Sequence, residues 1–127
     1  MAKRVSQRQL DVLRREWQKR LRLQDWKITS RFVAPGDRPE NMHDAVGYNF
    51  INEAAKEGRI SILDPELADD GEMERSEDIE NTLVHELLHC HLAPFFTEEE
   101  PEATLMEQAI ELLAGALCEL KRENGRK

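Results

Sequence analysis

The sequence lacks any uninterrupted apolar run of the 18 or so residues that a membrane-spanning helix requires. Its first 23 residues carry charges throughout and contain no apolar core of the kind that a secretory signal needs. Internal repeats and low-complexity linkers are absent as well. We therefore expect a cytoplasmic protein with no membrane partner, folded as a single domain over residues 1–127.

Cysteine is scarce, with only Cys90 and Cys118 in the chain. Two cysteines could form one disulfide, but a cytoplasmic location favours reduced thiols that behave as small buried apolar groups. We therefore expect both side chains to be free and buried.

Positive charge is scarce outside the N-terminal segment. Residues 1–31 hold ten Lys/Arg against three Asp/Glu, a balance of +7, so with a net charge of −8 the remainder carries −15. Such an acidic body argues against nucleic acid as the main ligand, although the basic segment leaves nucleic-acid binding open as a minor alternative. We interpret the basic side chains as a solvated helix face and expect a monomer.

Hydrophobic periodicity predicts an α+β fold. Ser6 is placed to cap a helix to about Leu23, and turn residues at 34–40 predict a loop. Residues 65–76 are acidic and rich in turn residues, so we expect them to be exposed. The other predicted elements are strands at 26–33, 45–51 and 58–63, a helix from Ser76 to about Leu92 that Pro94 ends, and a last helix that opens at 98–101 and runs to about Arg122.

The central motif is His85-Glu86-Leu87-Leu88-His89, an H-E-x-x-H pattern inside a predicted helix. At about 100° per residue, positions four apart lie within about 40° on one helix face, so both imidazoles can reach a single zinc ion. Glu86 lies beside that face, where it can accept a proton without binding the metal. Val84, Leu87 and Leu88 form a separate apolar face, which distinguishes the motif from a chance match.

A catalytic zinc needs a third protein ligand and an open fourth position. Phe95 stands where the metzincin pattern has its third histidine, and Leu92 stands at the glycine position of that pattern, so this arrangement is excluded. His91 lies about 140° from the mean direction of His85 and His89 on a continuing helix. We therefore expect His91 to be structural or partly exposed.

The last predicted helix offers a better third ligand. Glu107 and Glu111 share one helix face with Ala114 and Cys118, and a buried carboxylate is costly unless it is paired or bound to a metal. We predict Glu107 as the ligand and Glu111 as the acceptor for the outer N–H of a histidine ligand. Apolar residues occupy the other side of this helix, so we expect it to be substantially buried; they are Ile110, Leu113, Leu117 and Leu120.

The two motifs together, His85-Glu-Leu-Leu-His89 and Glu107-Gln-Ala-Ile-Glu111, resemble the gluzincin metallopeptidases, particularly the minigluzincins and short phage and bacterial metallopeptidases. The resemblance implies a small zincin-like domain with an N-terminal helix, a short three-stranded sheet, an active-site helix and a ligand-bearing C-terminal helix. Gluzincins usually add a His or Tyr that stabilises the transition state, and the candidates here are Tyr48 and His43.

The function implied is hydrolysis of a peptide or protein substrate by zinc-activated water, with Glu86 as general base. A strand within 45–63 would form a sheet edge that pairs with an extended substrate. Two alternatives stay open. One is a non-enzymatic zinc-stabilised interaction module, and the other is a regulatory peptidase dedicated to one partner protein.

Overall fold

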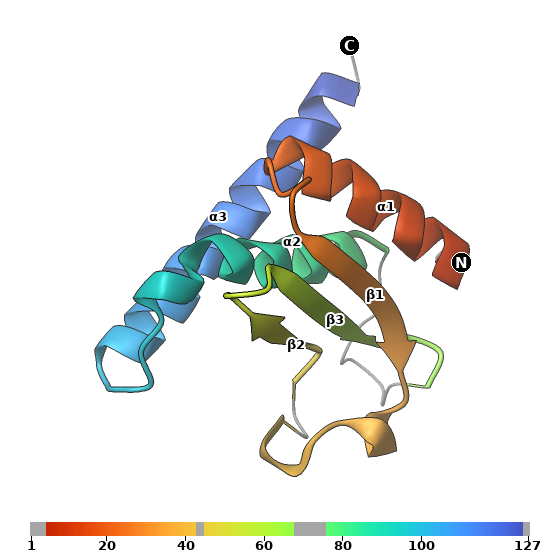
Figure 1. Cartoon of the computed structure of the whole chain (residues 1–127). Coiled ribbons are helices and arrows are strands. Elements are labelled where there is room, and N and C mark those ends of the chain that lie inside the picture. The colour runs from red at the N-terminus through yellow and green to blue at the C-terminus, as the bar shows by residue number, and fades with distance from the viewer. Residues whose placement is uncertain (1–4, 43–44, 68–75, 126–127) are drawn as a thin grey trace.

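The chain folds into three helices and one three-stranded sheet, which confirms the predicted α+β class (Figure 1). The computed structural model describes residues 5–42, 45–67 and 76–125. The helices are α1 (Gln7–Arg20), α2 (Ser76–Leu92) and α3 (Glu102–Gly125), and the strands are β1 (Lys27–Val33), β2 (Gly47–Asn52) and β3 (Glu57–Leu63). Short 3₁₀ turns lie at Pro35–Asp37, Glu40–Met42 and Ala93–Phe95.

Helix α1 begins at the predicted capping box. The Ser6 hydroxyl accepts from the backbone N–H of Gln9, and the Gln9 side chain accepts from the backbone N–H of Ser6. The helix ends at Arg20, earlier than predicted, because Arg22 adopts a left-handed conformation with φ of 60° that turns the chain toward β1. Leu10 and Trp17 are buried on its inner face.

The sheet has the order β1-β3-β2, with β1 parallel and β2 antiparallel to the central strand. Because β3 pairs on both sides, it is the most buried strand, with Ile60, Ser61, Ile62 and Leu63 all buried. Strand β2 is therefore an edge strand, which confirms that a strand within 45–63 forms an edge of the sheet.

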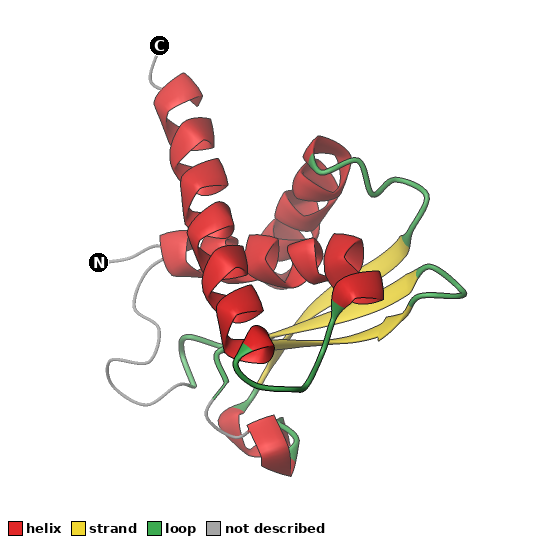
Figure 2. Cartoon of the chain, turned by 90° about the vertical axis from the view of Figure 1, so that its left-hand side faces the viewer, coloured by secondary structure: helices red, strands yellow, loops and turns green. Residues whose placement is uncertain are grey.

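The helices pack in two layers against one side of the sheet (Figure 2). Helix α1 covers β1, α2 crosses β2 and β3, and α3 packs on the far side of α2. Helix α2 is thus enclosed between the sheet and α3. Its inner residues are almost wholly inaccessible to solvent and form the centre of the core: Ile79, Leu83, Val84 and Leu87.

The prediction that the last helix is substantially buried is wrong. Only Ile110, Ala114 and Cys118 of α3 are buried. Because α3 packs mainly on α2, its outer side meets solvent, and four leucines there are 50–76% exposed: Leu105, Leu112, Leu113 and Leu120.

A buried carboxylate joins the three helices. Glu80 of α2 accepts a hydrogen bond from Trp17 Nε1 of α1 at 2.7 Å and pairs with the Lys121 ammonium of α3. Lys121 also lies 3.1 Å from Glu16 of α1. These contacts attach the C-terminal half of α3 to α1 and α2. The polar residues of the predicted site lie in its N-terminal half.

Both cysteines are free and buried, as predicted. Burial raises the pKa of Cys90 to about 12 and that of Cys118 to about 11, so both are neutral thiols. Among the described residues, no helix has the length and apolar character needed to cross a bilayer. Residues 68–75 of the predicted acidic segment lie outside the described part of the chain, whereas Glu66 and Leu67 are exposed.

Candidate metal centre

Helix α2 presents two imidazoles on the face that meets α3. His85 and His89 lie one helical turn apart, with ring centroids separated by 5.3 Å. Their side chains are only 14% and 12% exposed. The opposite face of α2 carries the buried residues Val84 and Leu87. The apolar spacing therefore fixes the rotation of α2 and turns both imidazoles away from the sheet.

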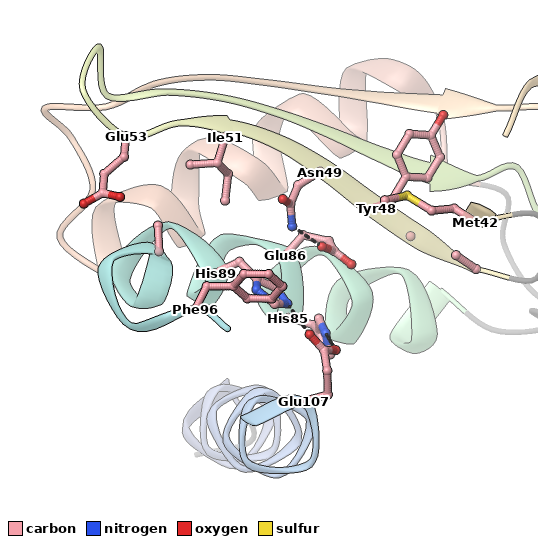
Figure 3. A pocket seen from close by; sticks show the side chains of 13 residues that line it. Met42, Tyr48, Asn49, Ile51, Glu53, His85, Glu86, His89, Phe96 and Glu107 are labelled. Carbon is pink, nitrogen blue, oxygen red and sulfur yellow. Dashed lines mark hydrogen bonds and ion pairs between the residues drawn. The ribbon is translucent and has the colours of Figure 1, made fainter. Parts of the chain in front are cut away.

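Helix α3 places the Glu107 carboxylate against both imidazoles (Figure 3). Its Oε2 atom lies 3.0 Å from His85 Nε2, and its Oε1 atom lies 2.9 Å from His89 Nε2. One ligand atom from each of the three residues lies within 4.8 Å of the others. Two imidazole nitrogens and one carboxylate oxygen are also the donor types that a catalytic zinc takes in proteins.

Glu111 contacts the outer nitrogen of His85. Its Oε2 atom lies 2.7 Å from Nδ1, so Nδ1–H donates to Glu111 in the tautomer that this contact favours. In neutral His85 the Nε2 atom is then an acceptor that faces an acceptor oxygen of Glu107 at 3.0 Å. Two acceptors at this distance repel each other unless a proton or a cation lies between them, so the arrangement suits a bound cation.

The electrostatic surroundings of the two histidines differ. Burial lowers the pKa of His85, but the nearby carboxylates outweigh burial, and the net shift is upward from 6.5. For His89, burial dominates and lowers the pKa despite the opposing effect of Glu107. In the metal-free chain, a proton on His85 can therefore relieve the clash of acceptors, while His89 favours the neutral form that binds metals.

Glu86 lies about 100° around α2 from His85, beside the histidine face, and its side chain points toward β2 (Figure 3). The residue is 6% exposed, and its Oε1 atom accepts a hydrogen bond from the Asn49 side-chain amide of β2. Burial raises the pKa of Glu86 to about 7, against the lowering effects of His85 and Asn49. A carboxylate with this pKa can accept and release a proton near neutral pH.

The sequence analysis did not identify Asn49 as a site residue. Its only signal is a polar residue between Tyr48 and Phe50 in a strand, and the packing of β2 on α2 that brings it to Glu86 is a tertiary feature. Gly47, two residues earlier on the same face of β2, allows the close approach. A Cβ atom there would lie 2.4 Å from Thr82 Cγ2 and 3.3 Å from Glu86 Oε2.

A pocket of about 500 Å³ opens beside the candidate metal centre. Helix α2 and strand β2 form two of its walls, and Glu107 of α3 lies at its margin. Phe96 stacks edge-on near His89, with ring centroids 6.2 Å apart. The remaining lining is largely apolar and includes Met42, Ala45, Ile51 and Ala93.

Of the two candidates for stabilising the transition state, Tyr48 lies in the described part of the chain and lines the pocket without joining the cluster. The Tyr48 ring points away from Glu86, because adjacent residues of a strand face opposite sides of the sheet (Figure 3). His43 lies outside the described residues. His91 is exposed, and its Nε2 atom contacts the backbone carbonyl of Leu21, in agreement with its predicted place outside the site.

Comparison of the chain with protein-family models, with curated proteins and with solved structures finds no match.

Proposed function

We propose that this chain is a zinc-dependent peptidase of the gluzincin type, with a zincin-like fold. The observation that carries the proposal is the convergence of His85, His89 and Glu107 on one side of α2, with the buried Glu86 carboxylate beside them. The three residues would hold the metal, and Glu111 would orient His85. When bound, zinc activates water at neutral pH and polarises a carbonyl oxygen.

Glu86 would move the proton. One of its oxygens is held by the Asn49 amide, which leaves Oε2 to take a proton from the attacking water and to deliver it to the leaving amine. In the metal-free chain burial raises the pKa of Glu86 to about 7, and a base of this strength can also give the proton back.

Strand β2 would bind the substrate. It is an edge strand that lines the pocket through Gly47, Asn49 and Ile51, so an extended polypeptide can add to its free side by main-chain hydrogen bonds. The apolar lining near Phe96 would accept an apolar side chain next to the bond that is cut. Substrate binding by main-chain pairing with β2, together with one apolar pocket, suits unfolded or extended protein segments.

The burial of Glu86 favours this function over a zinc-stabilised interaction module. Desolvation of a carboxylate is costly, and a purely structural metal site gains nothing from a carboxyl group that does not bind the metal. Glu107 contacts the two histidines, whereas the hydrogen bond of Glu86 goes to the strand proposed to bind substrate. A peptidase dedicated to one partner protein would keep the same residues and differ only in its range of substrates.

The test combines metal analysis with hydrolysis assays on purified protein. We expect about one zinc per chain and chelator-sensitive cleavage of unfolded polypeptides. Glu86→Gln should keep the zinc and lose cleavage, because the amide keeps the shape but cannot accept the proton. His89→Ala should lose both. Zinc binding without cleavage of any unfolded or extended polypeptide would support the interaction module, and full activity of Glu86→Gln would exclude the mechanism.

A further inference from the structure

Helix α3 carries a second apolar face, opposite the one that packs on α2. At 100° per residue, Glu107, Ala114 and Cys118 lie on one side, and an apolar stripe lies about 180° away. The stripe spans an arc of about 100°, which is the width of a face that normally packs against another element. All of its residues are exposed: Leu105, Ala109, Leu112, Leu113, Ala116 and Leu120.

This stripe is continuous along most of the helix. From Leu105 to Leu120 it extends about 22 Å, and the most exposed member, Leu112, has 76% of its surface in contact with solvent. Glu102 and Glu123 occupy the same arc and bound the stripe at its two ends. Figure 2 shows that this long helix lies on the outside of the molecule, away from the sheet.

The order of residues in the stripe is the same in both directions. About the midpoint between Leu112 and Leu113, Leu105 corresponds to Leu120 and Ala109 corresponds to Ala116. An isologous two-fold interface brings the same patch of two copies together. In the antiparallel register about this midpoint, every apolar residue of the stripe meets an apolar residue of the second copy. In an antiparallel pair, leucine would meet leucine, alanine would meet alanine, and the small alanines would let the two helices approach closely. A partner of another kind needs no such symmetry.

We propose that the stripe is the interface of a homodimer in which two copies of α3 pair antiparallel. Antiparallel packing also aligns the two helix dipoles favourably. In this register Glu102 lies near Glu123 of the second copy, so added salt should strengthen association by screening their repulsion. A single helix pair gives an interface at the small end of the known range, so the dimer should be weak and concentration-dependent.

The dimer leaves the candidate metal centre open, because Glu107 and Glu111 lie on the other side of α3. The dimer would form on the outer side of α3, whereas Glu107, the proposed metal ligand, lies on its inner side. The proposal does not depend on the metal or on peptidase activity, and its failure would leave both untouched.

Sedimentation equilibrium of the full chain over a wide concentration range tests the association. We expect a reversible monomer–dimer equilibrium that Leu112→Asp weakens at least tenfold, since two buried leucines are lost per dimer. The control is Val12→Asp, which places the same charge at a 55% exposed apolar position of α1 and should leave association unchanged. Equal weakening by both variants, or a wild-type chain that stays monomeric at all concentrations, would overturn the proposal.

Disulfide trapping tests the orientation. Leu105→Cys and Leu120→Cys chains should form a mixed disulfide when combined under oxidation, whereas neither should cross-link efficiently with itself. The native thiols are buried and should not interfere. Efficient cross-linking of Leu105→Cys with itself would show parallel pairing and contradict the antiparallel dimer.

Discussion

Nδ1 of His85 lies 2.7 Å from Oε2 of Glu111, on the far side of the ring from the nitrogen that faces Glu107. The contact gives two carboxylates of one helix different tasks at the same imidazole. Glu107 also reaches His89, whereas the contact of Glu111 with the cluster is through His85 alone. Replacing Glu107 or Glu111, one at a time, by a residue without a carboxylate should therefore have unequal effects on zinc binding.

The first prediction concerns zinc affinity. Glu107→Ala should abolish most binding, because it removes one of three proposed ligands, whereas Glu111→Ala should weaken binding by about 10- to 100-fold. Competition with a chromophoric chelator measures both. Gln108→Ala, on the same helix turn, is the control and should bind as the wild type does. If Glu111→Ala proves the more damaging, Glu111 is the ligand and the two roles are exchanged.

The second prediction concerns the stability of the metal-free protein. The pKa of Glu86 is raised from 4.5 to about 7 by burial, so between these pH values the folded chain holds a proton that the unfolded chain has released. Stability contributed by this group is therefore present at low pH and lost as pH rises toward 7. The loss is about 2–3 kcal/mol, and Glu86→Gln should avoid it because an amide does not ionise.

Urea unfolding at pH 5 and pH 8, with chelator present, measures this effect as the difference between wild type and Glu86→Gln. The difference removes the contributions of titrating groups that do not interact with Glu86; it retains the coupled effect on His85, whose pKa the Glu86 carboxylate helps to raise. The variant should gain stability relative to wild type as pH rises. An unchanged difference would show that Glu86 ionises at its ordinary pKa in the folded chain.

The third prediction concerns the spacing between β2 and α2. Gly47→Ala would place a methyl group 2.4 Å from Thr82 Cγ2, so the Thr82 side chain or the strand itself must shift, and a shift of the strand would move Asn49. We expect a loss of stability of about 1–3 kcal/mol, together with reduced activity as Asn49 withdraws from Glu86. Gly115→Ala is the matched control, because a Cβ there meets nothing within 4 Å, and it should stabilise α3 by about 0.5–1 kcal/mol.

The clustering of the proposed metal-binding residues could be predicted because helical periodicity is a local property. The spacing of His85 and His89, and that of Glu107 and Glu111, places each pair on one helix face whatever the rest of the fold does. The three contacts in the structure follow once the two helices meet. Cap and turn chemistry likewise located the start of α1 and the end of α2.

Features that depend on how elements meet could not be predicted. The strand order β1-β3-β2 and the packing of β2 on α2 that brings Asn49 to Glu86 are long-range features, for which the residues themselves carry no local signal. The same limit explains the error about α3. Its sequence is apolar on two sides, but only one side finds a partner within the chain, so the sequence could not show that Leu112 is exposed.

The last prediction concerns the buried contact among the three helices. Lys121→Met would remove the ammonium that faces Glu80 and leave a nearly buried carboxylate with its hydrogen bond from Trp17 and a more distant Arg122, 4.0 Å away. We expect a loss of about 1–3 kcal/mol in the free energy of unfolding. Glu80→Gln should cost less, because the amide oxygen can still accept from Trp17.

The double variant should lose less stability than the sum of the two single losses, because it leaves no buried carboxylate without its ammonium partner. Urea unfolding of the four proteins gives the coupling energy, which we expect to be about 1 kcal/mol or more. Strictly additive losses would show that Glu80 and Lys121 contribute independently and that the ion pair between them adds nothing to the attachment of α3.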